Sequence, residues 1–215
     1  MRYVKEVFDV VTFDQAKHVV LTSDPNNPNK FQEETDYFID IFRNSGYVSS
    51  NSKVLDFGCG MGRISKELIV TFNCDVIGVD ISPSMRNFAN LYVGNPRKFK
   101  AVESYSESES INIAFCILVL QHVENPQKEI DNLYNVIKPN GYLVLVNENK
   151  RLVPADVDKN NYVIWNDDGF NIQAAIREKF KEIESRNYLN SDIDILLFQK
   201  TDYVPKYFNY TTNAL

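Results

Sequence analysis

Cysteine, histidine and tryptophan are scarce in this chain. Only three Cys, two His and one Trp occur among its 215 residues. The cysteines, Cys59, Cys74 and Cys116, lie in or beside apolar segments without a short paired spacing, which predicts reduced, buried thiols in a reducing compartment. Neither His18 nor His122 has a second ligand at helical spacing, so the sequence indicates no metal site.

Positive charge is also in short supply. The formal net charge is −6 and the isoelectric point is about 5.0, and Lys and Arg are scattered rather than clustered. A protein that binds the phosphate backbone of DNA or RNA needs a basic face. The composition therefore argues against nucleic acid as the partner.

Long apolar runs are missing. The longest, residues 113–120, holds eight residues, far fewer than the roughly 20 that a membrane-spanning helix needs. The N-terminal MRYVKEVFDV has no hydrophobic signal core. We therefore expect a soluble, cytoplasmic protein without a membrane partner.

What the chain does have is an alternation of short apolar runs with longer amphipathic segments, typical of parallel strands covered by helices. Strands are expected at 53–58, 74–82, 98–104, 111–120, 142–149, 181–189 and 192–200, the last two as a possible hairpin, and helices at 31–46, 62–72, 82–93, 126–137 and 169–180. Residues 138–141, KPNG, are expected to form a turn. This order predicts an α/β fold: a Rossmann-like, doubly wound, mostly parallel seven-stranded sheet with helices on both faces.

The predicted organisation is a single domain over residues 1–215. Residues 1–50 precede the first strand and are expected to form an N-terminal helical cap. Residues 51–150, which hold the glycine motif VLDFGCGMG, are expected to form a cofactor-binding core. Residues 151–215 would supply a loop or lid at 151–168, the C-terminal helix and strands, and an aromatic tail.

The most informative stretch is VLDFGCGMG, where an apolar run ends on Asp56 and glycines follow at Gly58, Gly60 and Gly62. Glycines between a strand and a helix let the backbone approach a ligand, and the helix start offers free N–H groups. A dinucleotide fingerprint would place its third glycine where Arg63 stands. An acid before the glycines also repels a pyrophosphate and suits a ligand with a cationic amino-acid end.

A second acid, Asp80, ends the next predicted strand, VIGVDIS, 22 positions after Gly58. An acid at this strand tip can accept both hydroxyl groups of an adenosine ribose. That role is shared by dinucleotide and S-adenosylmethionine sites. Asp80 therefore indicates a nucleoside ligand without choosing between the two, and a helix N-cap or a solvated turn acid is the structural alternative.

From residues 53 to 147 the chain resembles the class I S-adenosylmethionine-dependent methyltransferases, especially their small-molecule branch. VLDFGCGMG, VIGVDISPSM, LVLQHVENP and LYNVIKPNGYLVLV carry the resemblance. It implies S-adenosyl-L-methionine as the cofactor. In the implied cofactor site the glycine motif lies at the methionine end of the cofactor and Asp80 binds the ribose. Ile81 and Met85 would lie beside the adenine, Glu103 or Ser104 would bind the adenine amino group, and Leu118 and His122 would lie nearby. The motif residues are Asp56, Phe57, Gly58, Cys59, Gly60, Gly62 and Arg63.

The predicted function is methyl transfer to an oxygen or nitrogen atom of a small polar molecule. The acceptor would lie at the tips of the fourth and fifth strands. His122 there could be a general base or a structural hydrogen-bonding residue, and Glu148 could be a base, a cation binder or a solvated acid. His18, Tyr37 and Trp165 are candidate acceptor-site residues.

Two other classes stay open. One is an NAD-dependent oxidoreductase of Rossmann type, against which Arg63 argues. The other is a non-catalytic module that keeps the methyltransferase-like fold and binds the cofactor or a partner. Methylation of a nucleic-acid base is disfavoured, since the fourth strand ends in LQHV rather than the Asn/Asp-Pro-Pro-aromatic tetrapeptide of amino-directed base methyltransferases. The oligomeric state cannot be read from the sequence.

Overall fold

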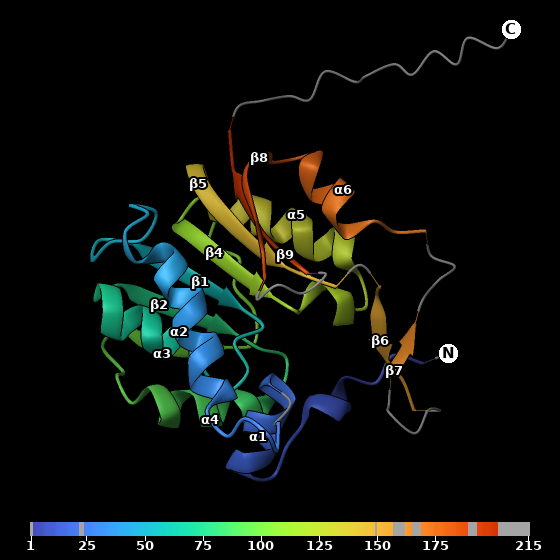
Figure 1. Ribbon diagram of the computed structural model, residues 1–215. Coiled ribbons are helices and arrows are strands. Elements are labelled where there is room, and N and C mark those ends of the chain that lie inside the picture. The colour runs from blue at the N-terminus through green and yellow to red at the C-terminus, as the bar shows by residue number, and fades with distance from the viewer. Residues whose placement is uncertain are drawn as a thin grey trace, which may run out of the picture.

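The computed structural model describes residues 2–21, 24–148, 150–156, 162–164, 169–188 and 193–201 (Figure 1). Its helices are η1 (Lys5–Phe8), α1 (Phe13–Val20), α2 (Lys30–Arg43), α3 (Arg63–Phe72), α4 (Pro83–Val93), η2 (Leu120–His122), α5 (Pro126–Val136) and α6 (Ile172–Arg177). Its strands are β1 (Lys53–Phe57), β2 (Asp75–Val79), β3 (Phe99–Val102), β4 (Ile111–Ile117), β5 (Ile137–Val146), β6 (Leu152–Pro154), β7 (Tyr162–Ile164), β8 (Lys181–Asn187) and β9 (Asp194–Gln199).

Seven strands form one sheet in the order β3-β2-β1-β4-β5-β9-β8. Neighbours from β3 to β5 are parallel, β9 is antiparallel to β5, and β8 pairs antiparallel with β9. The predicted sheet and the C-terminal hairpin are therefore confirmed. Strand order reverses between β1 and β4, and a sheet of this type opens a crevice at the carboxyl ends of its strands there.

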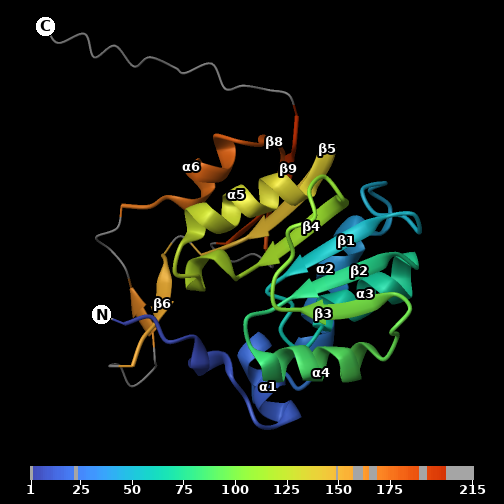
Figure 2. The same cartoon turned by 180° about the vertical axis from the view of Figure 1, so that it is seen from behind.

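Helices cover both faces of the sheet, as the strand–helix alternation predicts (Figures 1 and 2). Helices α2 and α3 pack on one face and α5 and α6 on the other. Strand β4 lies between the two cores and is buried on both sides: Ile113 and Phe115 join the first core, and Ala114 and Cys116 join the second. The continuous apolar sequence of β4 follows from this central place.

Helix α4 begins as its sequence predicts. Ser82 is the N-cap, its side chain accepts a hydrogen bond from the backbone N–H of Met85, and Pro83 occupies the first helical position. A proline lacks an N–H, so it costs nothing at a position where that group has no partner within the helix. Both residues therefore fix the start of α4 directly after the tip of β2.

Several predicted boundaries are wrong: β2 ends at Val79 rather than 82, α2 at Arg43 rather than 46, and α6 spans Ile172–Arg177 rather than 169–180. Two further differences have a clear physical reason. Strand β4 ends at Ile117 rather than residue 120, because Leu118 takes a left-handed backbone conformation with φ of 56°. The KPNG stretch is not a separate turn but part of β5, which bulges there: Ile137 pairs with Ile111, and the next pair is Tyr142 with Ile113. A left-handed residue inside the bulge gives a turn-like composition within a strand.

The N-terminal region caps the sheet edge, as predicted, but with one more α-helix than expected. Helix α1 begins in a capping box between Thr12 and Gln15, a signal that the sequence contains. Within the stretch 151–168, predicted as a loop or lid, β6 and β7 form a small antiparallel sheet. Residues 157–161, 165–168 and 202–215, with Trp165 and nearly all of the tail, lie outside the described residues.

All three cysteines are buried free thiols, as predicted. Within the part of the chain that the structure describes, no helix has both the length and the hydropathy to cross a membrane.

Candidate active site

The glycine motif forms a tight loop between β1 and α3. Gly58, Gly60 and Gly62 all have positive φ, at 76°, 53° and 85°. The loop is tied to β2, since the N–H groups of Gly58 and Cys59 donate to the carbonyl oxygen of Val79 at 2.7 and 2.9 Å. A left-handed conformation is costly for residues with a Cβ, so the glycines fix the path of this loop.

Asp56 lies beneath the loop and is 4% exposed. The hydroxyl of Ser65, in the first turn of α3, donates to its Oδ2 at 2.6 Å. Burial raises the pKa of Asp56 to about 6, although the Ser65 hydrogen bond and the positive charge of Arg63 both act to lower it. A buried carboxylate with a raised pKa is stabilised by any cation that approaches it, which fits the predicted cationic end of the cofactor.

We expect Asp56→Asn to remove a pH dependence of stability. Because the folded state holds the Asp56 proton more tightly than the unfolded chain does, its contribution to stability is complete below about pH 4 and is lost as the pH rises through about 6. A pKa that differs by one between the folded and unfolded states changes the free energy of unfolding by about 1.4 kcal/mol. Urea unfolding of both proteins between pH 4 and 7.5 should therefore show the wild type losing a few kcal/mol relative to the variant, whereas the exposed acid substitution Asp14→Asn should leave the slope unchanged.

Asp80 stands just beyond the end of β2 and joins that strand tip to the glycine loop. Its Oδ2 accepts from the N–H of Gly60 at 2.8 Å, and its Oδ1 accepts from the N–H of Ser82 at 2.9 Å. Burial raises the pKa of this carboxyl, and the two backbone hydrogen bonds oppose the rise. A carboxylate has about four acceptor positions, so each oxygen keeps one for a further donor such as a sugar hydroxyl.

The residues predicted beside the adenine occupy different environments. Ile81 is exposed, whereas Met85 is buried in a small core with Ala16 and Met61. Glu103 and Ser104 are exposed just after β3, and Glu103 lies 3.5 Å from Arg86 of α4.

Arg86 itself fixes the turn between β2 and α4. Its guanidinium donates to the carbonyl oxygens of Asp80 and Ile81 at 2.8 and 3.0 Å. Arg86 therefore connects Asp80, the predicted ribose residue, with Glu103, a predicted adenine residue, and sequence reasoning missed both contacts.

A side-chain bridge joins the tips of β4 and β5. Gln121 is buried, its backbone N–H donates to Oδ1 of Asn147 at 3.2 Å, and its Oε1 accepts from the N–H of Glu148 at 2.8 Å. The predicted cofactor residue Leu118 lies at the same tip in a left-handed conformation, which costs roughly 1–3 kcal/mol. Strain of this kind is often found beside active sites.

His122 packs in a cluster of three rings. Its ring centroid lies 5.9 Å from Phe8 and 5.3 Å from Tyr162, and those two rings are 6.3 Å apart. Burial lowers the pKa of His122 to about 4, a shift that a backbone contact with Leu152 opposes. Its Nδ1 is buried without a hydrogen-bond partner among the described residues. The imidazole is therefore neutral at pH 7 and could accept a proton.

Residues 2–21 run along this whole edge of the sheet. Tyr3 forms a bridge with Ala155 after β6, and farther along Asp9 accepts a hydrogen bond from the Ser82 hydroxyl at 2.7 Å. Val20, at the end of α1, lies so close to the glycine loop that a Cβ placed on Gly60 would be 2.5 Å from its Cγ2. The N-terminal segment thus lies against β6, the tip of β2 and the glycine loop.

Three predicted side chains lie elsewhere. His18 is exposed on α1. The Tyr37 hydroxyl donates to the carbonyl oxygen of Asn187 at 2.9 Å and so ties α2 to β8. Arg63 is buried, and its guanidinium donates to the Thr35 hydroxyl at 3.0 Å, which joins α3 to α2. Their predicted contacts with ligands stay predictions.

Sequence reasoning missed several polar residues of this edge. Ser65 could have been found, because a serine on the apolar face of a helix, beside Ile64 and Leu68, needs a buried partner. Gln121 carried a similar signal between Leu120 and His122. Phe8 carried none, since its contact with His122 depends on how the N-terminal segment crosses the sheet.

The fold and the site together define a Rossmann-like cofactor-binding domain with two acids flanking a glycine loop. The sequence profile of the methyltransferase domain family matches residues 24–188. The chain belongs to that family, which confirms the predicted class.

Curated relatives and solved structures agree with this assignment. The chain is 32% identical over 118 residues to the mitochondrial ubiquinone biosynthesis O-methyltransferase of Schizosaccharomyces pombe, covering 51% of this chain and 42% of that protein. It is 27% identical over 195 residues to the ubiquinone biosynthesis O-methyltransferase of Rickettsia typhi, covering 77% and 78%. The N-methyltransferase NodS of Bradyrhizobium japonicum, in complex with S-adenosyl-L-homocysteine, matches with a TM-score of 0.62 and 17% identity over 87% of this chain and 97% of NodS.

This chain spans about half the length of the first curated relatives that it matches. At 17% identity, the similarity to NodS supports the fold assignment alone.

Proposed function

We propose that this protein binds S-adenosyl-L-methionine and transfers its methyl group to an oxygen or nitrogen atom of a small polar molecule. One observation carries the proposal: two carboxylates with raised pKa values, the buried Asp56 and the half-buried Asp80, flank a glycine loop at the tips of neighbouring parallel strands. The family of the chain and the names of its relatives support the same reaction.

The residues at this edge fit the cofactor. Asp80 keeps acceptor positions for the ribose hydroxyl groups, and the charge of Asp56 favours a positively charged amino-acid end nearby. The bound cofactor would supply a methyl group activated by a sulfonium. Because Val20 contacts the loop at Gly60, its side chain has to move away when a ligand lies on the loop.

The acceptor would be held where β4 and β5 end, between the glycine loop and the Phe8–His122–Tyr162 cluster. Holding it in line with the methyl group and excluding water supply much of the rate. In this proposal His122 takes a proton from a hydroxyl acceptor, and Glu148 at the β5 tip is the second candidate. Burial keeps the ring of His122 in its neutral form at neutral pH, which is the form that a general base needs.

The pH profile of turnover tests this role of His122. S-adenosyl-L-methionine is held at saturation throughout, so that the titration of Asp56 near pH 6 does not limit cofactor binding. With any hydroxyl acceptor that the enzyme methylates, we then expect kcat/KM for the acceptor to stay flat from about pH 8 down to about pH 5, because the pKa of the ring is lowered to about 4. His122→Gln should lower kcat at least about 100-fold. Unchanged turnover in this variant, or a profile that falls below pH 7, would exclude His122 as the base in its present environment.

Isothermal titration tests the cofactor half of the proposal. S-adenosyl-L-methionine and S-adenosyl-L-homocysteine should both bind, and NADH should not. Formation of S-adenosyl-L-homocysteine with a panel of phenols, hydroxy acids and amines would then identify the acceptor. Binding of NADH alone would favour the oxidoreductase, and cofactor binding without turnover of any acceptor would favour the non-catalytic module.

The buried free thiols of Cys59, Cys74 and Cys116 suit a reducing compartment, since disulfides persist in oxidising ones. We place the proposed enzyme in the cytoplasm on that ground. Fractionation of cells that express the protein tests the location.

A further inference from the structure

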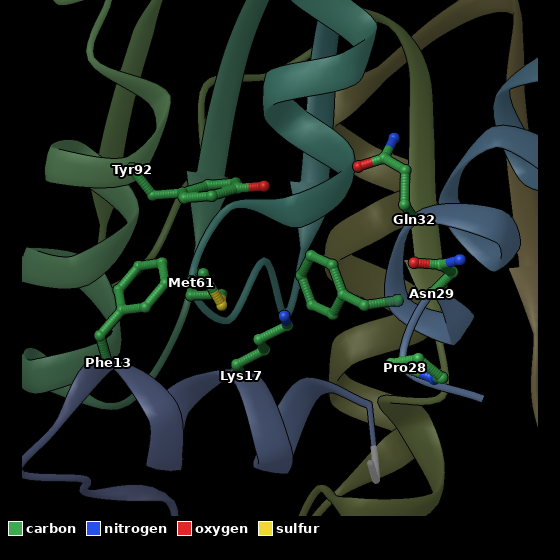
Figure 3. Close-up of a pocket in the computed structure, with 8 residues that line it drawn as sticks. Phe13, Lys17, Pro28, Asn29, Gln32, Met61 and Tyr92 are labelled. Carbon is green, nitrogen blue, oxygen red and sulfur yellow. The ribbon is translucent and has the colours of Figure 1, made fainter. Parts of the chain in front are cut away.

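A cavity of about 230 Å³ opens between α1, the start of α2, and α4 (Figure 3). It is separate from the strand tips where the acceptor would lie. Its lining consists of Phe13, Lys17, Pro28, Asn29, Phe31, Gln32, Met61 and Tyr92. An apolar cavity of about 150 Å³ can hold a benzene ring, so this one has room for a ring with a substituent.

Aromatic rings and a thioether form the apolar part of the cavity. Phe13 and Tyr92 lie with ring centroids 5.6 Å apart on one side, and Phe31 contributes a third ring from α2. Figure 3 shows Met61 between Phe13 and Lys17, with the Tyr92 ring above Phe13. Flat ligands gain from edge or offset contacts with such rings.

The charge of the cavity is positive, in a protein whose net charge is −6. None of the lining residues is an acid. The Lys17 ammonium lies 4.8 Å from the centroid of Phe31 and forms no ion pair within the described part of the chain. Lys66 is not a lining residue, but its ammonium lies 4.2 Å from the ring centroid of Tyr92, which is one.

Nearby acids do not cancel this charge inside the cavity. Asp36 accepts a hydrogen bond from the Gln32 amide at 2.8 Å, outside the lining. Burial and, to a smaller extent, the charge of Glu67 raise the pKa of Tyr92, and Glu67 is not a lining residue either. An ammonium group has three N–H donors, and a ring below Lys17 leaves donors for a ligand in the cavity.

We propose that this cavity binds a small organic anion, a carboxylate carried on an aromatic ring, with the carboxylate at Lys17 and the ring against Phe13, Phe31 and Tyr92. The site goes beyond the proposed methyl transfer and does not depend on it. It touches the glycine loop only through Met61, which lies between Gly60 and Gly62. An occupant would therefore sit against the side of the loop away from the β4 tip.

A titration of the full chain with benzoate in the absence of cofactor tests the site. Protein NMR and isothermal titration calorimetry measure the binding. We expect amide shifts around Lys17, Phe31 and Tyr92, and binding that weakens as salt is added. Lys17→Gln should weaken benzoate binding roughly fivefold. The control Lys128→Gln removes the same charge from the exposed face of α5 and should leave the affinity unchanged.

Two neutral or ring-free probes separate the parts of the proposal. Benzamide lacks the negative charge, so it should bind the wild type more weakly than benzoate does. Its affinity for Lys17→Gln should equal its affinity for the wild type. Acetate that bound as tightly as benzoate would overturn the role of the rings. Equal benzoate affinity of the wild type and Lys17→Gln, with unchanged melting temperatures, would overturn the site.

Discussion

Asp80→Ala is expected to weaken binding of S-adenosyl-L-homocysteine by roughly 10- to 150-fold. A hydrogen bond to a charged group contributes about 1.5–3 kcal/mol, and about 1.4 kcal/mol corresponds to a factor of ten in Kd. The substitution removes the acceptor positions left for the ribose and also releases the N–H of Gly60, which Asp80 binds at 2.8 Å. Isothermal titration at pH 7 measures the effect.

The matched control is Asp75→Ala, at the opposite end of β2. Asp75 is exposed and pairs with Lys98 at 3.0 Å, so its loss removes the same charge from the same strand far from the glycine loop. Its titration curve should coincide with that of the wild type. If Asp80→Ala binds as tightly as Asp75→Ala, the assignment of Asp80 to the ribose is wrong.

Gly60→Ala is expected to destabilise the protein and to abolish measurable binding of the cofactor product. The backbone φ of 53° costs an alanine about 1–2 kcal/mol. Its Cβ would also lie 2.5 Å from Cγ2 of Val20, and such overpacking adds about 1–3 kcal/mol. Urea unfolding and isothermal titration report the two effects.

Two further variants separate strain from crowding. Gly46 has a similar φ of 77°, and no atom lies within 4 Å of a Cβ added there. Gly46→Ala should therefore lose only the stability that backbone strain costs. Adding Val20→Ala to Gly60→Ala should recover the crowding part of the stability but not the binding. A Gly60→Ala protein no less stable than Gly46→Ala would contradict the contact between α1 and the glycine loop.

The sequence predicts the core of this fold well because its signals there are local. Apolar runs of strand length alternate with helical periodicity, and Ser82 and Pro83 mark the start of α4 at the residue where it begins. The acids of the site, Asp56 and Asp80, could be predicted for the same reason. Each directly follows or ends an apolar run, and parallel strands bring their carboxyl ends to one edge.

The errors arise where tertiary contacts override local composition. KPNG has turn residues but continues β5, because Ile137 is already paired with Ile111 before the bulge. Leu118 interrupts an apolar run that reads as strand. No local sequence pattern predicts a left-handed backbone conformation at a leucine.

The contacts of the N-terminal segment also could not be predicted from the sequence. Phe8 meets His122 and Tyr162 from positions far apart in the chain, and Asp9 meets Ser82. These pairings depend on how a capping segment lies across the sheet, which periodicity does not determine. The proposed acceptor pocket would be built from such segments, and for this reason the acceptor could not be predicted from the motifs.

A crystal structure of the protein with S-adenosyl-L-homocysteine tests the central claim most directly. The predicted result places both ribose hydroxyls on the Asp80 carboxylate and the amino-acid end of the ligand over Gly58 and Gly60, with Val20 displaced from the loop. A saturated crystal in which the ligand lies elsewhere, while Val20 still contacts Gly60, would contradict it.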